Sequence, residues 1–149
     1  MNLDLSGKTA VVCGSTQGLG LASAIELSLL GASIVLMARN EEKLKDVITK
    51  LDSSKKQQHA YLVADFADVK KVSDAIHSFI ASGKTAQILI NNTGGPAGGP
   101  AMNATNEEFL QTFNNHLLCN HVLAQALVPG MKAAGFGRII NIISTSVKQ

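Results

Sequence analysis

Short apolar runs alternate along the chain with longer stretches in which apolar residues recur every three or four positions. The short runs are apolar on both faces, which is typical of strands buried on both sides of a parallel sheet. We predict five such strands, at residues 8–13, 33–38, 59–64, 87–90 and 138–143.

Four helices are predicted between the strands, at residues 19–30, 40–51, 69–82 and 105–134. Asn40 is expected to cap the second helix. Thr105 opens the fourth, in which Glu107 and Glu108 lie near the positive end of the helix dipole. We expect Pro129 to kink this helix or to end its main part.

This alternation of strands and helices predicts an α/β fold with right-handed crossovers. The expected architecture is a doubly wound, Rossmann-type parallel sheet with strand order 3-2-1-4-5 and helices on both faces. The 149 residues contain no linker, repeat or low-complexity segment. We therefore expect a single domain over residues 1–149.

Composition and charge exclude several classes of protein. The formal net charge is only +2 and the basic residues are scattered, so no nucleic-acid partner is expected. Cys13 and Cys119 lie in apolar runs without Cys-x-x-Cys spacing, which indicates buried thiols in a reducing cytosol. No apolar run approaches the ~20 residues of a membrane span, and no basic-then-apolar leader is present. We expect a cytoplasmic protein without membrane contact.

A glycine-rich loop at residues 14–20 follows the first strand and opens the first helix. Glycines here let backbone N–H groups approach a diphosphate at the positive end of the helix, and the last one lets the helix pack closely on the strand. The alternative is a glycine-rich turn that binds nothing. We predict a dinucleotide site, with contacts from Gly14, Ser15, Gln17, Gly18, Leu19 and Gly20.

The end of the second strand indicates which dinucleotide is bound. An acid there would hydrogen-bond the adenine ribose, as in NAD-binding proteins, and would repel a 2′-phosphate. This chain has Ala38 followed by Arg39, and a guanidinium suits a phosphate. We therefore predict NADP rather than NAD. Alternatively, Arg39 is a surface residue that pairs with Glu41 or Glu42.

The spacing Gly-x-x-x-Gly-x-Gly, together with Asn91-Asn92-Thr93-Gly94 after the fourth strand, resembles the short-chain dehydrogenase/reductase family. Residues 138–144 resemble the family's fifth strand and the active-site serine that follows it. The resemblance covers the whole chain. It implies an NADP-dependent oxidoreductase that acts on a small alcohol or carbonyl substrate.

The resemblance also implies roles for individual cofactor-binding residues. Asp65 and Phe66 would hold the adenine. Asn91 would either contact the nicotinamide ribose or brace the central strand, and Gly94 would also contact the cofactor.

Two catalytic candidates follow from the same resemblance. Ser144 would hydrogen-bond the substrate oxygen, and Ser146 is a neighbouring candidate. Apart from the resemblance, a Ser-Thr-Ser run after a strand is more often a turn or a helix cap. His116 stands where the family usually has an asparagine that organises a proton-relay water, and Thr93 replaces the usual alanine. The imidazole could hold a water or move a proton, or it could simply pack in the helix. His121 and Cys119 do not join it at metal-ligand spacing, so no metal is expected.

One part of the family's machinery is missing from the sequence. The family relies on a Tyr-x-x-x-Lys pair whose tyrosine exchanges a proton with the substrate oxygen, yet the only tyrosine is Tyr61 in the third strand. We expect little or no reductase activity from the chain as written. The hypotheses are the cofactor half of an NADP-dependent dehydrogenase, or a non-catalytic module that senses NADP(H) or oligomerises. An isoleucine-rich fifth strand at the sheet edge indicates a homo-oligomer.

Overall fold

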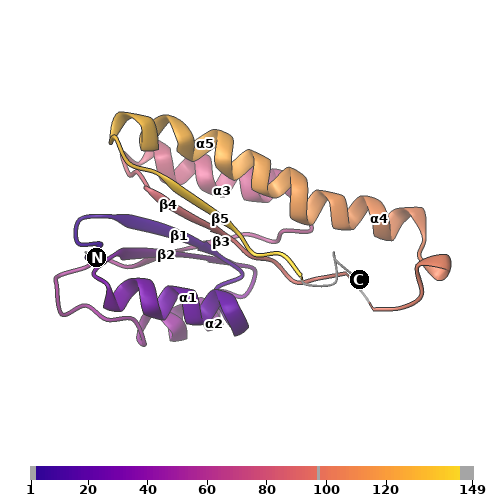
Figure 1. Cartoon of the computed structure of the whole chain (residues 1–149), viewed down its shortest axis with the longest axis horizontal. Coiled ribbons are helices and arrows are strands. Elements are labelled where there is room, and N and C mark those ends of the chain that lie inside the picture. Colours follow the sequence, from indigo (N-terminus) through magenta and orange to yellow (C-terminus); the bar gives the residue numbers. More distant parts are fainter. Residues whose placement is uncertain (1–2, 97, 145–149) are drawn as a thin grey trace.

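A five-stranded parallel sheet forms the centre of the molecule in the computed structural model, which describes residues 3–96 and 98–144 (Figure 1). The strand order is β3-β2-β1-β4-β5, which confirms the predicted order. The bounds are β1 Thr9–Cys13, β2 Ser33–Ala38, β3 Ala60–Val63, β4 Ile88–Asn91 and β5 Arg138–Asn141.

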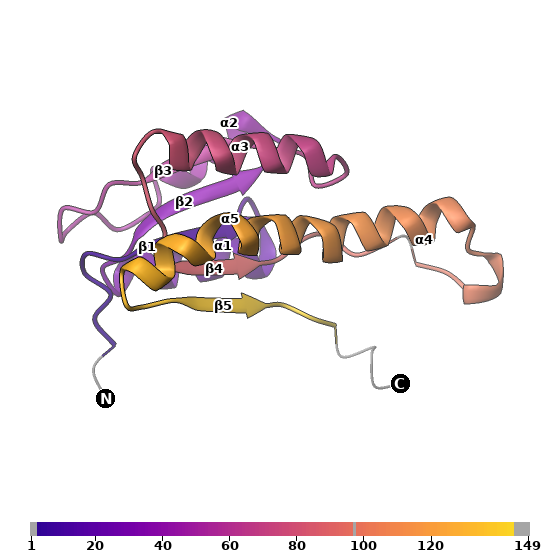
Figure 2. The same cartoon turned by 90° about the horizontal axis from the view of Figure 1, so that it is seen from above.

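Helices cover both faces of the sheet, as predicted for a doubly wound fold. Figure 1 shows α1 and α2 on one face and α3 and α5 on the other, and Figure 2 shows α4 continuing the line of α5 beyond the sheet. The helices are α1 Gly18–Leu29, α2 Glu41–Ile48, α3 Val69–Ala81, α4 Asn106–Phe113 and α5 Cys119–Ala133, with a 3-10 turn, η1, at Ala101–Asn103.

The alternation of side chains along β1 explains why the central strands are apolar on both faces. Val11 and Cys13 pack into the core beneath α3 and α5, whereas Ala10 and Val12 pack into the core beneath α1 and α2. All four side chains are fully buried. A parallel strand between two helical layers therefore needs apolar residues at every position.

Local hydrogen bonds fix where the helices begin. The Asn40 side chain accepts from the Lys43 backbone N–H at 2.9 Å, which confirms the predicted cap of α2. At the start of α4, Thr105 and Glu108 form a reciprocal capping box. Both predicted helix starts are therefore supported by side-chain caps.

Pro129 does not end the helix, which was one of its two predicted effects. Pro129 lies inside α5, and the long helix instead changes geometry at a π-helical segment, η2 (Asn114–Leu118). Pro129 removes an N–H that would bond to the carbonyl of Gln125. Both residues are exposed, so water can replace that donor and the helix continues.

Candidate functional site

A cavity of about 640 Å³ lies at the carboxyl ends of the central strands. Its walls come from the glycine loop, the end of β2, the loops after β3 and β4, and η2. Open parallel sheets bind ligands at this edge, where the strand order reverses. The strand order reverses here between β1 and β4. The glycine loop follows β1, and the Asn91-Asn92-Thr93-Gly94 segment begins at the last residue of β4.

The glycine loop supplies one wall of this cavity. Gly14, Gln17, Gly18 and Leu19 line it, together with Thr16, which the sequence had not singled out. Gly14 and Gly18 have φ angles of +57° and +56°, and a Cβ at Gly18 would point into open space. The side chain of the N-cap residue Gln17 does not cap the first turn of α1, so the N–H groups of that turn keep their capacity to bind an anion.

Two predicted loop contacts lie behind the cavity wall. The Ser15 side chain is fully buried, and its hydroxyl has no hydrogen-bond partner in the part of the chain that the structure describes. Gly20 is also buried, and a Cβ there would collide with the carbonyl of Gly14. Gly20 therefore serves close packing between α1 and the loop, as expected, and neither residue is among those lining the cavity.

The end of β2 forms a basic corner of the cavity. Arg39, Asn40 and Lys43 line it, and a second hollow beside Arg39 is bounded by Lys71. Arg39 is exposed and makes no ion pair with any residue the structure describes. The acids Glu41 and Glu42 instead pair with Lys45, at 3.3 and 2.9 Å, so the alternative interpretation of Arg39 is not observed. Lys43 was not among the residues predicted from the sequence, although it lies one helical turn beyond the cap residue Asn40.

Asp65 and Phe66 line the cavity from the loop after β3, where the resemblance placed them. One carboxylate oxygen of Asp65 accepts from the Ala67 backbone N–H at 3.0 Å, which fixes the turn. The ring of Phe66 packs partly against the core beneath α3 and α5.

Asn91 braces the sheet and does not line the cavity. Its side chain is 3% exposed, and its amide nitrogen donates to the Asn141 side-chain oxygen at 2.8 Å, between β4 and β5. Of the two roles left open for Asn91, the geometry supports the bracing role. The cavity is lined instead by Asn92, Thr93 and Gly94.

The two catalytic candidates come from different elements, and neither is among the described residues that line the cavity. His116 is half-buried in η2, and its Nδ1 lies 2.8 Å from Thr93 Oγ1. Ser144 is exposed beyond the end of β5 and is not among the described residues that line the cavity. Ser146 lies outside the described residues.

Cys13, Cys119 and Tyr61 are titratable side chains outside this site whose pKa values are shifted. Burial raises the pKa of the Cys13 thiol to about 12 and that of Cys119 to about 11, so both are neutral thiols. The Tyr61 hydroxyl donates to Glu41 at 2.9 Å, and this hydrogen bond raises the pKa of Tyr61. No three His, Cys, Asp or Glu residues in ranges 3–96 and 98–144 cluster as a metal site. Across the same ranges, no helix has the length and apolar character needed to cross a bilayer.

The family model for short chain dehydrogenases matches residues 8–149, nearly the whole chain. The chain belongs to the short-chain dehydrogenase family. Its sequence relatives include the 3-oxoacyl-[acyl-carrier-protein] reductase of Rickettsia bellii, which is 32% identical over 95% of this chain and 56% of the relative. They also include a human protein named inactive hydroxysteroid dehydrogenase-like protein 1, 31% identical over 94% of this chain and 43% of the relative.

Solved structures show the same short-chain dehydrogenase fold. L-sorbose reductase from Gluconobacter frateurii, complexed with NADPH and L-sorbose, matches with a TM-score of 0.90 and 34% identity, over 99% of this chain and 57% of that one. A gluconate 5-dehydrogenase from Burkholderia cenocepacia, in complex with NADP and tartrate, matches with a TM-score of 0.85 and 31% identity, over 99% and 58%. The chain spans about half the length of the curated relatives it matches.

Proposed function

We propose that this short-chain dehydrogenase binds NADP(H) and serves hydride transfer between the cofactor and a small alcohol or carbonyl substrate. The observation that carries the proposal is the basic corner at the end of β2. Arg39 faces the cavity there without an ion-pair partner among the described residues, and Lys43 and Lys71 lie at its borders. Asp65 also lines this corner, but it forms no ion pair with Arg39, and a 2′-phosphate would give the guanidinium an anionic partner.

The described residues fit the rest of the dinucleotide. The cavity of about 640 Å³ lies within the usual range for cofactor sites, roughly 300–1,000 Å³. The glycine loop would hold the diphosphate on the N–H groups of α1, and Asp65 and Phe66 would border the adenine. The L-sorbose reductase and gluconate 5-dehydrogenase structures contain NADPH and NADP, which supports this choice.

When bound, NADPH supplies the hydride, and the protein must orient the substrate and handle a proton. We assign to Ser144 the task of hydrogen-bonding the substrate oxygen, because it follows the strand end that borders the crevice. His116 would hold or move a proton through a ring nitrogen.

Isothermal titration calorimetry of the 149-residue chain with NADPH and with NADH tests the cofactor assignment. We expect NADPH to bind at least about tenfold more tightly, which corresponds to ~1.4 kcal/mol. No binding of either dinucleotide would refute the dinucleotide site, and equal affinities would refute the phosphate role of Arg39.

A second candidate is a non-catalytic module that binds NADP(H) without turnover. The supporting observation is that these 149 residues contain no Tyr-x-x-x-Lys pair, and that Tyr61 is committed to Glu41 away from the cavity. A relative at 31% identity is itself named inactive. We propose that this polypeptide binds NADPH but does not reduce carbonyl compounds by itself. Loss of NADPH absorbance with a panel of simple ketones would overturn that statement.

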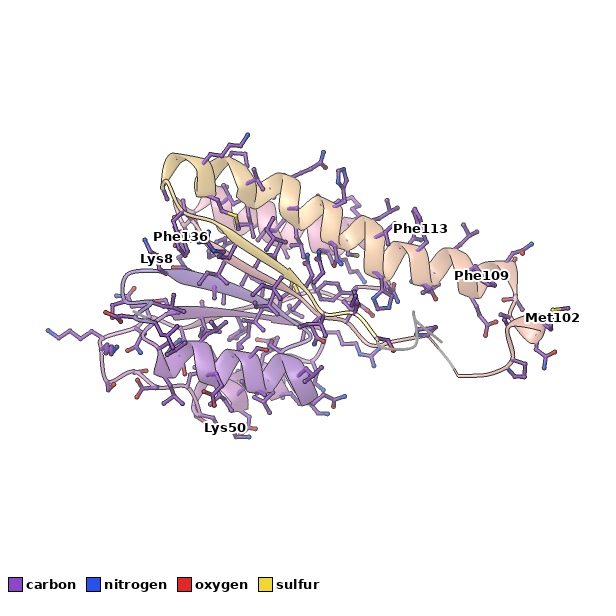
Figure 3. All side chains as sticks on the ribbon, in the orientation of Figure 1. Lys8, Lys50, Met102, Phe109, Phe113 and Phe136 are labelled. Atoms are coloured by element: carbon purple, nitrogen blue, oxygen red, sulfur yellow. The ribbon has the colours of Figure 1, made fainter. Side chains whose placement is uncertain are left out.

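We also propose that the protein self-associates and is cytoplasmic. Phe109, Leu110 and Phe113 are exposed on α4, and Figure 3 places Phe109, Phe113 and Met102 where the chain projects beyond the sheet. Contiguous apolar side chains of this kind favour an interface. Two buried free thiols suit a reducing compartment. Sedimentation velocity that shows only a monomer at micromolar concentration would refute the association.

A further inference from the structure

The structure brings together the two positions at which the sequence departs from the family motifs. Thr93 lies two residues beyond the end of β4 and lines the cavity, whereas His116 lies in the middle of η2. The two are 23 residues apart in the chain, yet Thr93 Oγ1 and His116 Nδ1 are 2.8 Å apart. Neither an alanine at position 93 nor an asparagine at position 116 could form this hydroxyl–imidazole pair.

Other contacts hold η2 against the cavity loops on either side of the pair. The Asn115 side-chain amide lies 2.8 Å from the Phe66 carbonyl oxygen when its nitrogen is turned towards it. The thiol of Cys119 donates to the same oxygen at 3.4 Å. Consecutive residues of η2 therefore reach two different loops, Asn115 the one after β3 and His116 the one after β4. The backbone of His116 is fixed, and the Thr93 contact decides how its ring is turned.

The Thr93–His116 contact fits two directions, because a hydroxyl can donate to Nδ1 or accept from it. Thr93 Oγ1 has no other hydrogen-bond partner among the described residues, so Nδ1 of His116 is the one acceptor that those residues offer to its proton. If Nδ1 accepts, the neutral imidazole carries its proton on Nε2. No described residue hydrogen-bonds to Nε2, which remains available as a donor.

We propose that Thr93 is a positioning residue for His116: its hydroxyl fixes the imidazole in the Nε2–H tautomer and presents that N–H to an oxygen of the bound ligand. The tautomer part rests on the Thr93–His116 contact, and the ligand part rests on the proposed binding of NADP(H). Thr93 and Asn115 line the cavity; His116 is not among the lining residues, but its ring contacts Thr93 and it is the chain neighbour of Asn115. A carbonyl or hydroxyl oxygen, which accepts a hydrogen bond, matches such a donor.

Long-range ¹H–¹⁵N NMR correlations of the histidine rings test the tautomer. His59 provides an internal reference, because its Nδ1 accepts from the Ile34 N–H at 3.1 Å and its Nε2 lies 2.8 Å from the Asp52 carbonyl oxygen, which fixes the same tautomer. We expect His116 to show the His59 pattern in the native chain and in Thr93→Ser. We expect Thr93→Val to shift it towards the averaged pattern of exposed His121, while His59 stays unchanged.

Two outcomes would overturn the proposal. One is a ¹H–¹⁵N pattern of His116 in the native chain that shows averaged tautomers or the Nδ1–H tautomer. The other is a folded Thr93→Val protein in which the pattern of His116 is unchanged. If Thr93→Val loses the His59 pattern and is therefore unfolded, the native chain and Thr93→Ser still decide the tautomer.

Titration with NADP⁺ then tests the ligand part. We expect the His116 Nε2–H signal to move on binding and the His59 signals to remain in place. If calorimetry shows that NADP⁺ binds while His116 does not respond, the ligand part fails. If NADP⁺ does not bind at all, the proposed function fails and the tautomer result stands separately.

Discussion

The backbone oxygen of Asn92 lies where Gly14 leaves room for it: a Cβ on residue 14 would be 2.5 Å from that oxygen. The Asn92 side chain also donates weakly to the carbonyls of Cys13 and Gly14, both at 3.4 Å. The glycine loop after β1 and the loop after β4 are thus built against each other. The first glycine of the motif makes room for protein backbone, and Gly18 is the one of its three glycines whose Cβ position is open.

Gly14→Ala should therefore destabilise the fold itself. We expect a loss of about 2–5 kcal/mol in the free energy of unfolding, from ~1–2 kcal/mol of left-handed backbone strain and ~1–3 kcal/mol of overpacking. Urea denaturation followed by circular dichroism measures this loss. A Gly14→Ala protein as stable as the native chain would show that the two loops can separate at no cost.

Gly18→Ala should affect cofactor binding more than stability. We expect only the strain of about 1–2 kcal/mol, together with a loss of about tenfold or more in NADPH affinity, ~1.4 kcal/mol. The matched control is Gly135→Ala, at φ +62° with equally open surroundings but remote from the cavity. Gly135→Ala should lose a similar free energy of unfolding and should keep the NADPH affinity of the native chain. Equal NADPH affinity in both variants would exclude Gly18 from the phosphate site.

Arg39→Ala should reduce the preference for NADPH. We expect NADPH affinity to fall about 10–100-fold, as when charge-assisted hydrogen bonds of ~1.5–3 kcal/mol are lost, with NADH affinity unchanged. Lys45→Ala is the control, since Lys45 is an exposed cation nearby that pairs with Glu41 and Glu42 and does not line the cavity. Parallel weakening of both dinucleotides in Arg39→Ala would contradict a role at the 2′-phosphate.

The two cysteines should be inert in the folded protein. The raised pKa values, about 12 for Cys13 and about 11 for Cys119, mean that the thiolate fraction stays negligible at pH 8 and rises only towards pH 11. We expect no reaction with iodoacetamide at pH 8 in buffer and two alkylated thiols in urea, as measured by mass spectrometry. Alkylation of the native chain at the rate of a free thiol would show that the core opens readily.

Asn141→Ala should leave the buried amide of Asn91 without its acceptor. We expect a loss of about 1–3 kcal/mol in the free energy of unfolding, the cost of an unsatisfied buried donor. Asn141→Asp keeps an acceptor oxygen and should remain close to the native chain. Ile143→Ala, on the exposed end of the same segment, should change stability by less than ~0.5 kcal/mol. A harmless Asn141→Ala would remove the bracing role of Asn91.

Local patterns were sufficient to predict the sheet, because each strand carries its own signal. The apolar residues along β1 and β2 indicate burial on both faces. Asn40 and Thr105 mark the starts of helices because each side chain caps a backbone N–H only three residues further along the chain. The glycine spacing likewise located the cavity. These features depend on neighbours in sequence, so a single sequence contains them.

Features that depend on distant contacts could not be predicted. Nothing around Asn114–Leu118 distinguishes a π-helical segment, which coincides with the tethers from Asn115 to Phe66 and from His116 to Thr93. The burial of Ser15 behind the loop also depends on how the loop turns, because its neighbours Thr16 and Gln17 line the cavity. The effect of Pro129 could not be predicted for a related reason. The free-energy cost of the hydrogen bond that it removes depends on whether water reaches the carbonyl of Gln125.

The π-helical segment makes the length of this helix a functional quantity. A π bulge is equivalent to one residue inserted into an α-helix, so deleting one residue from Asn114–Leu118 would restore regular α geometry. Five π-helical residues turn the helix about as far as four α-helical residues do at about 100° each. The bulge therefore accommodates the extra residue, and after the deletion the exposed face containing Phe109 and Phe113 would keep its direction. The change would be confined to η2, where Asn115 and His116 contact the loops after β3 and β4. The extra residue thus lets the helix make both contacts without turning its outer end.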